Sequence, residues 1–202
     1  AGYQLLHLVT NMLDVEKYEQ AEIVPKYEVA QLDEIVLESK RQVDLLLKAK
    51  SIRLQNLLPK QIRVRIDQEL IVRVLVNLLT NAIKYSGKDG VIEITYTESA
   101  IPNFIDLSIK DSGVGISKER LSKVFEKFFT SGDKKTGTGM STGLGLTFCK
   151  MAIEAHGGQI SAKSELDQGT TITFSIPLDV VEAADTSWSA QKEDKIKPNI
   201  SG

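Results

Sequence analysis

A glycine-rich segment, from Asp111 to Leu146, sets the strongest limit on the folds open to this sequence. It holds seven of the chain's 14 glycines, including Gly137-Thr138-Gly139 and Gly143-Leu144-Gly145-Leu146. The second of these groups opens a predicted helix, whose N-terminus would offer free backbone N–H groups to a phosphate. The spacing is not that of the P-loop, and no single strand leads directly into it, as a Rossmann fingerprint requires. A nucleotide bound here would therefore be bound by a different fold.

Helical and strand patterns alternate along the rest of the chain. Apolar residues recur at helical spacing over 31–50, 68–86 and 144–155, and the helix over 68–86, apolar on most sides, is expected to end at Ser86-Gly87. Alternating apolar residues predict two short strands around Pro59 and Lys60, then VIEITYTES, FIDLSIKD, and a final hairpin of QISAKSE and TTITFSIPL. This order predicts an α+β fold, a two-layer α/β sandwich with a mixed, largely antiparallel sheet and helices on one face.

The amino-acid composition bears on whether the protein binds nucleic acid or membranes. The 202 residues are 42% hydrophobic and 26% charged, as in soluble globular proteins, and 25 basic against 27 acidic residues give a net charge of -2. This balance gives no general electrostatic case for nucleic acid or an anionic membrane, and we expect neither as a partner. The single cysteine, Cys149, excludes an internal disulfide and fits a reducing compartment, so we expect a cytoplasmic location. No apolar run reaches the roughly 18 residues of a membrane-spanning helix.

The two ends of the chain differ from its middle. Residues 3–22 predict a helix with a broad apolar stripe, which would pack either on the main domain or, as we favour, on a second helix that the chain lacks or a partner supplies. Because the sequence has no initiating Met and opens inside this pattern, we expect a fragment, and any membrane anchor of the parent protein would lie outside it. After Leu178 the sequence becomes polar and mixed, which is typical of a tail or linker. The expected division is 1–23, 24–178 and 179–202.

The pentapeptide Asp111-Ser112-Gly113-Val114-Gly115 follows an alternating strand. A buried carboxylate at this place could accept a hydrogen bond from an exocyclic amine such as adenine N6. The glycines would let the backbone turn tightly and approach a flat ligand. An ordinary turn from strand to loop explains the pentapeptide at least as well when it is taken alone.

A polar stripe lies on the otherwise apolar helix over 68–86. Asn77, Asn81 and Lys84 are spaced i, i+4, i+7, which places them on one helix face. Amide oxygens are hard ligands suited to Mg²⁺, and a lysine beside them could meet phosphate. The alternative is a polar edge that faces solvent.

Together these stretches resemble one family, the catalytic ATP-binding domain of sensor histidine kinases. This domain belongs to a wider ATP-binding superfamily shared with type II topoisomerases, a heat-shock chaperone and a mismatch-repair protein. The resemblance covers about 24–178, and its elements occur in the family's order: NLLTNAIKYS, DSGVGI, FEKFF, GTGMSTGLGL, HGGQI and QGTTITFSIPL. It implies an ATP-dependent protein histidine kinase that uses ATP and Mg²⁺.

The resemblance also implies roles for single residues. Asp111 would bind the adenine amine, Thr170 would support the base through water, and Tyr85 would line the adenine or ribose side. Asn81, with Asn77, would hold Mg²⁺ against the phosphates, and Lys84 would touch phosphate; Asn81 and Lys84 are the implied catalytic residues. The full implied nucleotide site is Asn77, Asn81, Lys84, Tyr85, Asp111, Gly113, Gly115, Ile116, Phe125, Gly137, Thr138, Gly139, Gly143, Leu144, Gly145, Leu146 and Thr170.

A mobile ATP lid over about 116–142, fixed by Phe125 and Phe128, is a further implication, and the resemblance makes His156 structural. Residues 3–22 resemble the second helix of the dimerisation and phosphoacceptor hairpin that precedes this domain in the family. His7 lies on that second-helix pattern and is followed by Leu8, so we do not expect it to be the phosphoacceptor. The implied partners are the histidine-bearing first helix, in a homodimer of the parent kinase, and the receiver domain of a response regulator.

Two positions depart from, or refine, the family pattern. Family members often carry an arginine shortly after the phenylalanine box, which is FEKFF (125–129) in this chain. This chain has Phe129-Thr130-Ser131 there, so Lys127, Lys134 or Lys135 would have to substitute, as a point charge without the bidentate fork. The ATPase branches have a water-activating Glu where this chain has Asn77, and an amide cannot act as a general base. Slow hydrolysis and transfer to histidine are therefore expected. An ATP-binding regulatory module that has lost transfer, and a dimerisation scaffold, remain the alternatives.

Overall fold

The computed structural model describes residues 23–129 and 143–180 of the chain. The predicted helix over 3–22, His7 and most of the predicted tail lie outside these residues. The elements are β1 (Glu28–Gln31), α2 (Leu32–Ala49), β2 (Arg53–Asn56), β3 (Arg63–Ile66), α3 (Gln68–Tyr85), β4 (Val91–Glu98), β5 (Phe104–Asp111), α4 (Lys118–Leu121), α5 (Gly145–Ala155), β6 (Ile160–Glu165) and β7 (Gly169–Pro177). Within the described residues, no helix is both long and apolar enough to cross a bilayer.

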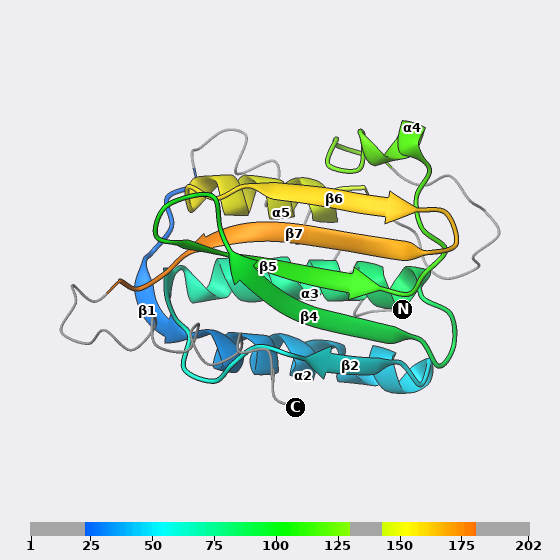
Figure 1. The fold of residues 1–202 in the computed structure, drawn as a ribbon, viewed down its shortest axis with the longest axis horizontal. Helices are drawn as coiled ribbons and strands as arrows, with labels where there is room; N and C mark the ends of the chain where they lie inside the picture. Colours follow the sequence, from blue (N-terminus) through cyan, green and yellow to red (C-terminus); the bar gives the residue numbers. More distant parts are fainter. Residues whose placement is uncertain (1–22, 130–142, 181–202) are drawn as a thin grey trace, which may run out of the picture.

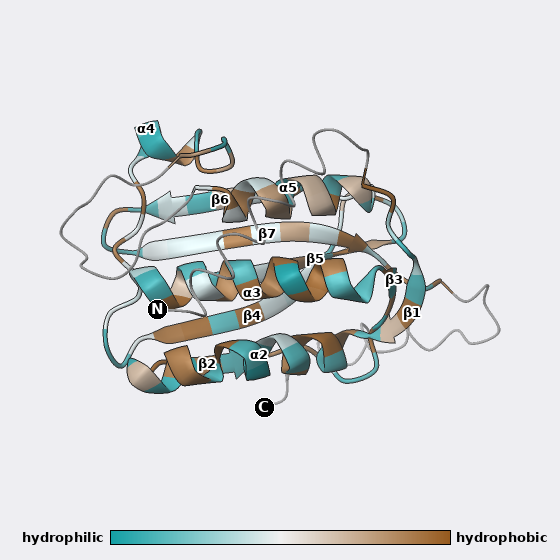
Figure 2. Ribbon diagram, turned by 180° about the vertical axis from the view of Figure 1, so that it is seen from behind, coloured by the Kyte–Doolittle hydropathy of each residue, from teal (hydrophilic) through white to brown (hydrophobic). Residues whose placement is uncertain are grey.

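The main sheet has five strands in the order β2-β4-β5-β7-β6. The β2–β4 pair is parallel, and the other pairs are antiparallel, so the predicted mixed, largely antiparallel sheet is confirmed. Helices α2, α3 and α5 lie side by side over one face of this sheet (Figures 1 and 2). The predicted two-layer α+β sandwich is therefore confirmed.

A small second sheet was not predicted. Strand β1 pairs antiparallel with β3, and β3 meets the main sheet only through an isolated bridge between Val64 and Leu178, just after β7. The chain enters α2 directly from β1 and enters α3 almost directly from β3, so this pair fixes where both helices begin. The sequence does not reveal β1, because the strand has four residues and only one buried side chain, which leaves no alternation to detect.

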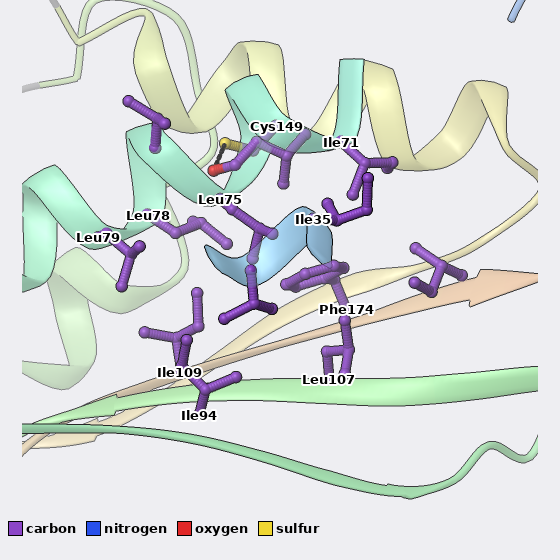
Figure 3. Close-up of a cluster of buried hydrophobic side chains, with 14 of the residues drawn as sticks. Ile35, Ile71, Leu75, Leu78, Leu79, Ile94, Leu107, Ile109, Cys149 and Phe174 are labelled. Carbon is purple, nitrogen blue, oxygen red and sulfur yellow. Dashed lines mark hydrogen bonds between the residues drawn. The ribbon is translucent and has the colours of Figure 1, made fainter. Parts of the chain in front are cut away.

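Helix α3 is the centre of the core. It contacts both α2 and α5, and its apolar side chains point onto the sheet, where they meet Leu107 and Ile109 of β5, Ile94 of β4 and Phe174 of β7 (Figure 3). Asp67 caps its N-terminus by accepting from the N–H of Leu70 at 3.1 Å. On its α5 side, the buried Cys149 thiol donates to the Val74 carbonyl at 3.7 Å (Figure 3), and burial raises the pKa of this thiol. The cysteine is therefore a core residue.

His156 joins the end of α5 to the start of α3. It is 2% exposed, and its Nε2 accepts from the backbone N–H of Asp67 at 3.0 Å. Its Nδ1 lies 2.7 Å from the Ala152 carbonyl, which can only accept, so the ring is neutral and carries its proton on Nδ1. This geometry agrees with the predicted structural role.

The burial of His156 makes a pH dependence of stability testable. Burial lowers the pKa of this ring, against the weaker opposing effects of the Ala152 carbonyl and the Asp67 charge. The unfolded chain therefore binds more protons than the folded chain, and the stability that His156 contributes falls as pH drops through about 6.5. Replacing it as His156→Gln should cost about 1–3 kcal/mol at pH 7.5, because the buried hydrogen bonds are lost, and less at pH 5.5.

Urea unfolding of both proteins between pH 5.5 and 7.5 measures this difference. The chain has two histidines, so His7→Gln is the matched control and should leave the pH dependence near that of the unmodified protein. A free-energy difference between His156→Gln and the unmodified protein that stays constant with pH would contradict the assignment.

Candidate functional site

Three parts of the fold meet beside the C-terminal half of α3: the turn after β5, the start of α5 and the β6–β7 hairpin. A Cβ placed on Gly113, just after β5, would lie 2.7 Å from the Tyr85 carbonyl oxygen at the end of α3. A Cβ placed on Gly145, at the start of α5, would lie 3.3 Å from Oδ1 of Asn77. The β6–β7 hairpin joins them, because the Asp167 N–H donates to the Val114 carbonyl at 2.9 Å. The polar stripe of α3, formed by Asn77, Asn81 and Lys84, and the two ends of the glycine-rich segment thus lie close together.

Glycine is required by geometry at two places in this region. Gly115 has a φ of +70°, and a Cβ there would lie 1.9 Å from the Glu165 carbonyl oxygen of β6. Gly143 has a φ of +69°, and a Cβ there would lie 2.5 Å from the backbone of Phe128. No L side chain fits either position without moving backbone. These glycines let the two ends of the segment pack closely on their neighbours.

Asp111 ends β5 as a buried carboxylate, 8% exposed. Its Oδ1 accepts from the backbone N–H groups of Gly113 at 2.8 Å and Thr170 at 3.3 Å. Burial raises the pKa of this carboxyl, and the two backbone hydrogen bonds oppose that rise. Because Oδ1 takes both bonds, Oδ2 is the oxygen through which Asp111 can accept from a ligand.

A hydroxyl pair beside Asp111 adds a second acceptor. Ser164 Oγ donates to the Gly169 carbonyl at 2.8 Å and accepts from the Ile116 N–H at 2.8 Å. Thr170 Oγ1 lies 2.9 Å from the same Ser164 oxygen. The only hydroxyl proton of Ser164 goes to the carbonyl, so Thr170 must donate to Ser164, and its own oxygen offers only lone pairs to a ligand. Asp111 and Thr170 therefore both present acceptors, which suits the donor hydrogens of an exocyclic amine or of a bridging water.

Sequence reasoning missed Ser164. It lies within the β6 pattern QISAKSE and has no motif of its own. Its partners come from Ile116, Gly169 and Thr170, so only the pairing of β6 with β7 and the fold of the loop after β5 place them together. The one feature of the sequence that could have indicated Ser164 as a site residue is a polar side chain on the inner face of the predicted strand.

The polar stripe of α3 runs along this site. Asn77 is 6% exposed, and Asn81 and Lys84 are half-buried, so the solvent-facing alternative is wrong for Asn77 and incomplete for the other two. The Lys84 ammonium lies 5.1 Å from the centre of the Tyr85 ring. Among the described residues, no cluster of three or more His, Cys, Asp or Glu side chains could hold a metal. A hard cation at this stripe would therefore be held by amide oxygens and by oxygens of a ligand.

The phenylalanine box is attached to α5 through its backbone. Thr147 Oγ1 donates to the Phe125 carbonyl at 3.2 Å and lies 3.4 Å from the Gly143 carbonyl. Phe125 is half-buried, whereas Phe128 is 68% exposed. Leu144 is buried at the N-cap of α5, and Leu146 packs partly buried against the core. The predicted site residues Gly137, Thr138 and Gly139 and the lysines 134 and 135 lie outside the described residues, and the mobile lid stays a prediction.

The sequence profile of the histidine kinase-, DNA gyrase B-, and HSP90-like ATPases matches residues 66–180. The chain therefore belongs to this family, and the resemblance predicted from the boxes is confirmed.

Curated relatives point to one branch of the family. The chain is 34% identical over 177 residues to the sensor protein KdpD of Clostridium acetobutylicum, a match that covers 87% of this chain and 19% of KdpD. It is 39% identical over 124 residues to the sensor histidine kinase WalK of Bacillus subtilis, covering 61% of this chain and 20% of WalK. The chain thus spans about a fifth of the length of these relatives.

Solved structures agree. The mycobacterial sensor histidine kinase MprB superposes with a TM-score of 0.64 at 26% identity, covering 75% of this chain and 97% of that one. The catalytic domain of histidine kinase ThkA superposes with a TM-score of 0.63 at 30% sequence identity, covering 75% of this chain and 95% of that one. ThkA in complex with the response regulator protein TrrA superposes with a TM-score of 0.69 at 28% sequence identity, covering 87% of this chain and 48% of that one. The described fold is that of a histidine kinase catalytic domain.

Asp111→Asn tests the acceptor site. The amide oxygen can still accept from Gly113 and Thr170, so the fold should survive, but the amide nitrogen would face the adenine amine as donor against donor. The loss of a buried hydrogen bond of this kind costs about 1–3 kcal/mol, which is roughly a 5- to 150-fold weaker affinity for ADP by calorimetry.

Asp106→Asn is the matched control, because Asp106 lies on the same strand and accepts from Ser175 Oγ at 2.7 Å, away from this site. Its affinity for ADP should stay within twofold of the unmodified protein. An equally small change for Asp111→Asn would refute the role assigned to Asp111.

Proposed function

We propose that this chain is the catalytic ATP-binding part of a sensor histidine kinase. It binds Mg·ATP and transfers the γ-phosphoryl group to a histidine on a dimerisation helix outside this chain. The observation that carries the proposal is the pair of acceptors at the end of β5. Asp111 Oδ2 and Thr170 Oγ1 can accept hydrogen bonds from the adenine amine, directly or through water. Family membership gives the same class of ligand.

The phosphates would lie between α3 and α5 in this proposal. The adenine at Asp111 is next to the end of α3, and the start of α5 approaches Asn77, so a nucleotide that extends along α3 reaches the free N–H groups of α5. Gly143 and Gly145 leave room for phosphate at that helix start, and Lys84 supplies positive charge. Asn81 and Asn77 are the proposed Mg²⁺ ligands. In phosphoryl transfer, the protein mainly positions groups and neutralises charge, and this arrangement suits that purpose.

Asn77 favours transfer over hydrolysis. It occupies the position where the ATPase branches carry a Glu, and its carboxamide cannot take a proton from water near neutral pH. Its oxygen is also directed at the start of α5. The acceptor is therefore proposed to be a histidine nucleophile supplied by another part of the parent kinase.

The partners follow from the same proposal. The histidine-bearing helix would come from the parent kinase acting as a homodimer, and the phosphoryl group would pass on to a receiver domain. The solved complex of ThkA with the response regulator protein TrrA supports the second step by analogy. A cytoplasmic location of this part of the parent, with no nucleic acid or membrane contact of its own, belongs to the same proposal.

Phosphoryl transfer between two chains tests the proposal. This chain is mixed with a longer version of the protein that keeps the preceding phosphoacceptor helix but carries Asn81→Ala, and radiolabelled ATP is added. The longer chain should become labelled through an acid-labile bond, and this chain should remain unlabelled, because His7 is not the acceptor. The matched control gives both chains Asn81→Ala and should abolish the labelling.

Two results would contradict the kinase assignment. Acid-stable labelling of this chain would indicate serine or threonine as the acceptor. Absence of label on both chains, with ATP binding shown by calorimetry, would favour a regulatory module that binds ATP without transferring it. The Phe129-Thr130-Ser131 sequence, which lacks the family's arginine, is the feature that favours this second function.

A further inference from the structure

The C-terminus of α3 is capped in an unusual way. A helix commonly ends with a glycine in the left-handed region, which satisfies its last carbonyls, and Ser86-Gly87 predicted such an end. The helix does end at Tyr85, but Ser86 is extended, with φ −71° and ψ 146°, and Gly87 is not left-handed. The glycine cap is therefore absent, and another group must satisfy these carbonyls.

Lys50 is that group. Its Nζ donates to the carbonyl oxygens of Ile83 at 2.8 Å, Lys84 at 2.9 Å and Ser86 at 3.0 Å. An ammonium has three donor hydrogens, so these three bonds use all of them. The positive charge also faces the negative end of the helix dipole.

Lys50 is itself held firmly. It is the C-cap residue of α2, at the turn into β2, and it is half-buried. Its own carbonyl accepts from the Asp89 N–H at 3.0 Å, and the Arg53 N–H donates to the Gly90 carbonyl at 2.9 Å. The α2–β2 turn is therefore bonded to the last turn of α3 through the Lys50 ammonium, and to the loop that follows α3 through its backbone.

The capped turn carries the residues proposed to bind the nucleotide. Asn81, Lys84 and Tyr85 project from it, and the Tyr85 carbonyl abuts Gly113, two residues after Asp111. A shift of this turn would move the proposed phosphate and base contacts relative to each other. Misplacement by about 1 Å can cost an enzyme roughly a hundredfold in rate.

We propose that Lys50 is a positioning residue for the nucleotide site: it fixes the last turn of α3, and through it Lys84 and Tyr85, without touching the ligand. This inference rests on the proposed function. It assigns a role in ATP binding to a lysine outside the motifs that resemble the family, at the end of a different helix and 34 residues before Lys84.

A double-mutant cycle tests this role. Lys50→Met keeps the unbranched apolar stem, one atom shorter, but removes all three donors, and it should weaken the affinity for a non-hydrolysable Mg·ATP analogue about tenfold by calorimetry. Lys84→Met in the unmodified chain should also cost about tenfold, but in the Lys50→Met background it should cost less than threefold, because Lys84 is already misplaced. A residue that only stabilises the fold would lower the melting temperature and leave the two effects additive.

Lys48→Met is the matched control. It makes the same change of charge two residues away, at an exposed lysine paired with Asp44. Its affinity for the analogue should stay within twofold of the unmodified protein. Lys50→Arg, which keeps charge and donors, should recover most of the affinity that Lys50→Met loses.

The outcomes separate the inference from the function it rests on. If the unmodified protein binds the analogue and Lys50→Met behaves like Lys48→Met, or the two losses add, the positioning role is overturned and the proposed function stands. If the unmodified protein does not bind the analogue, both are overturned. If Lys50→Met does not fold, Lys50→Gln, which keeps two donors, replaces it in the double-mutant cycle with Lys84→Met. Non-additive losses of affinity then support the positioning role of Lys50, and additive losses overturn it.

Discussion

The burial of α3 is the constraint on which the rest of the structure depends. The helix is covered by α2, α5 and the sheet, so most of its surface must be apolar, and in its C-terminal half the polar groups lie on the side toward the start of α5 and the end of β5. Asn77, Asn81 and Lys84 occupy that side. Three other parts of the site contact this helix: the Gly113 turn lies against Tyr85, the start of α5 lies against Asn77, and the α2–β2 turn is bonded through Lys50.

Backbone groups compensate for two of the charges that are removed from solvent at or beside this site. Asp111 loses solvent at the end of β5, and two N–H groups on one of its oxygens partly offset that cost. Lys50 is half-buried with three carbonyls around its ammonium. The two charges thus rest on main-chain groups, whose positions the sheet and the helices determine. Such preorganised dipoles are suited to holding a polar ligand in one orientation.

Local spacing made much of this predictable. The stripe of α3, the strand that ends in Asp111 and the glycines around the start of α5 are read from neighbouring residues, and the fold class follows from their order. The small β1–β3 sheet, the Ser164–Thr170 hydroxyl pair and the Lys50 cap were not predicted. The small sheet and the Lys50 cap join residues far apart in sequence, such as Lys50 with Ile83. Ser164 and Thr170 are six residues apart, but the Ile116 N–H that completes their cluster is 48 residues from Ser164. The Ser86-Gly87 prediction shows the same limit, because it identified where the helix ends but not what caps it.

The most direct test of the account is a crystal structure of this chain with Mg²⁺ and a non-hydrolysable ATP analogue. We expect the adenine amine at Asp111, directly or through a water shared with Thr170, Mg²⁺ at the oxygens of Asn81 and Asn77, and phosphates between Lys84 and the start of α5. An analogue bound elsewhere, for example in the groove between α2 and α3 lined by Glu34, Arg41 and Val72, would contradict it.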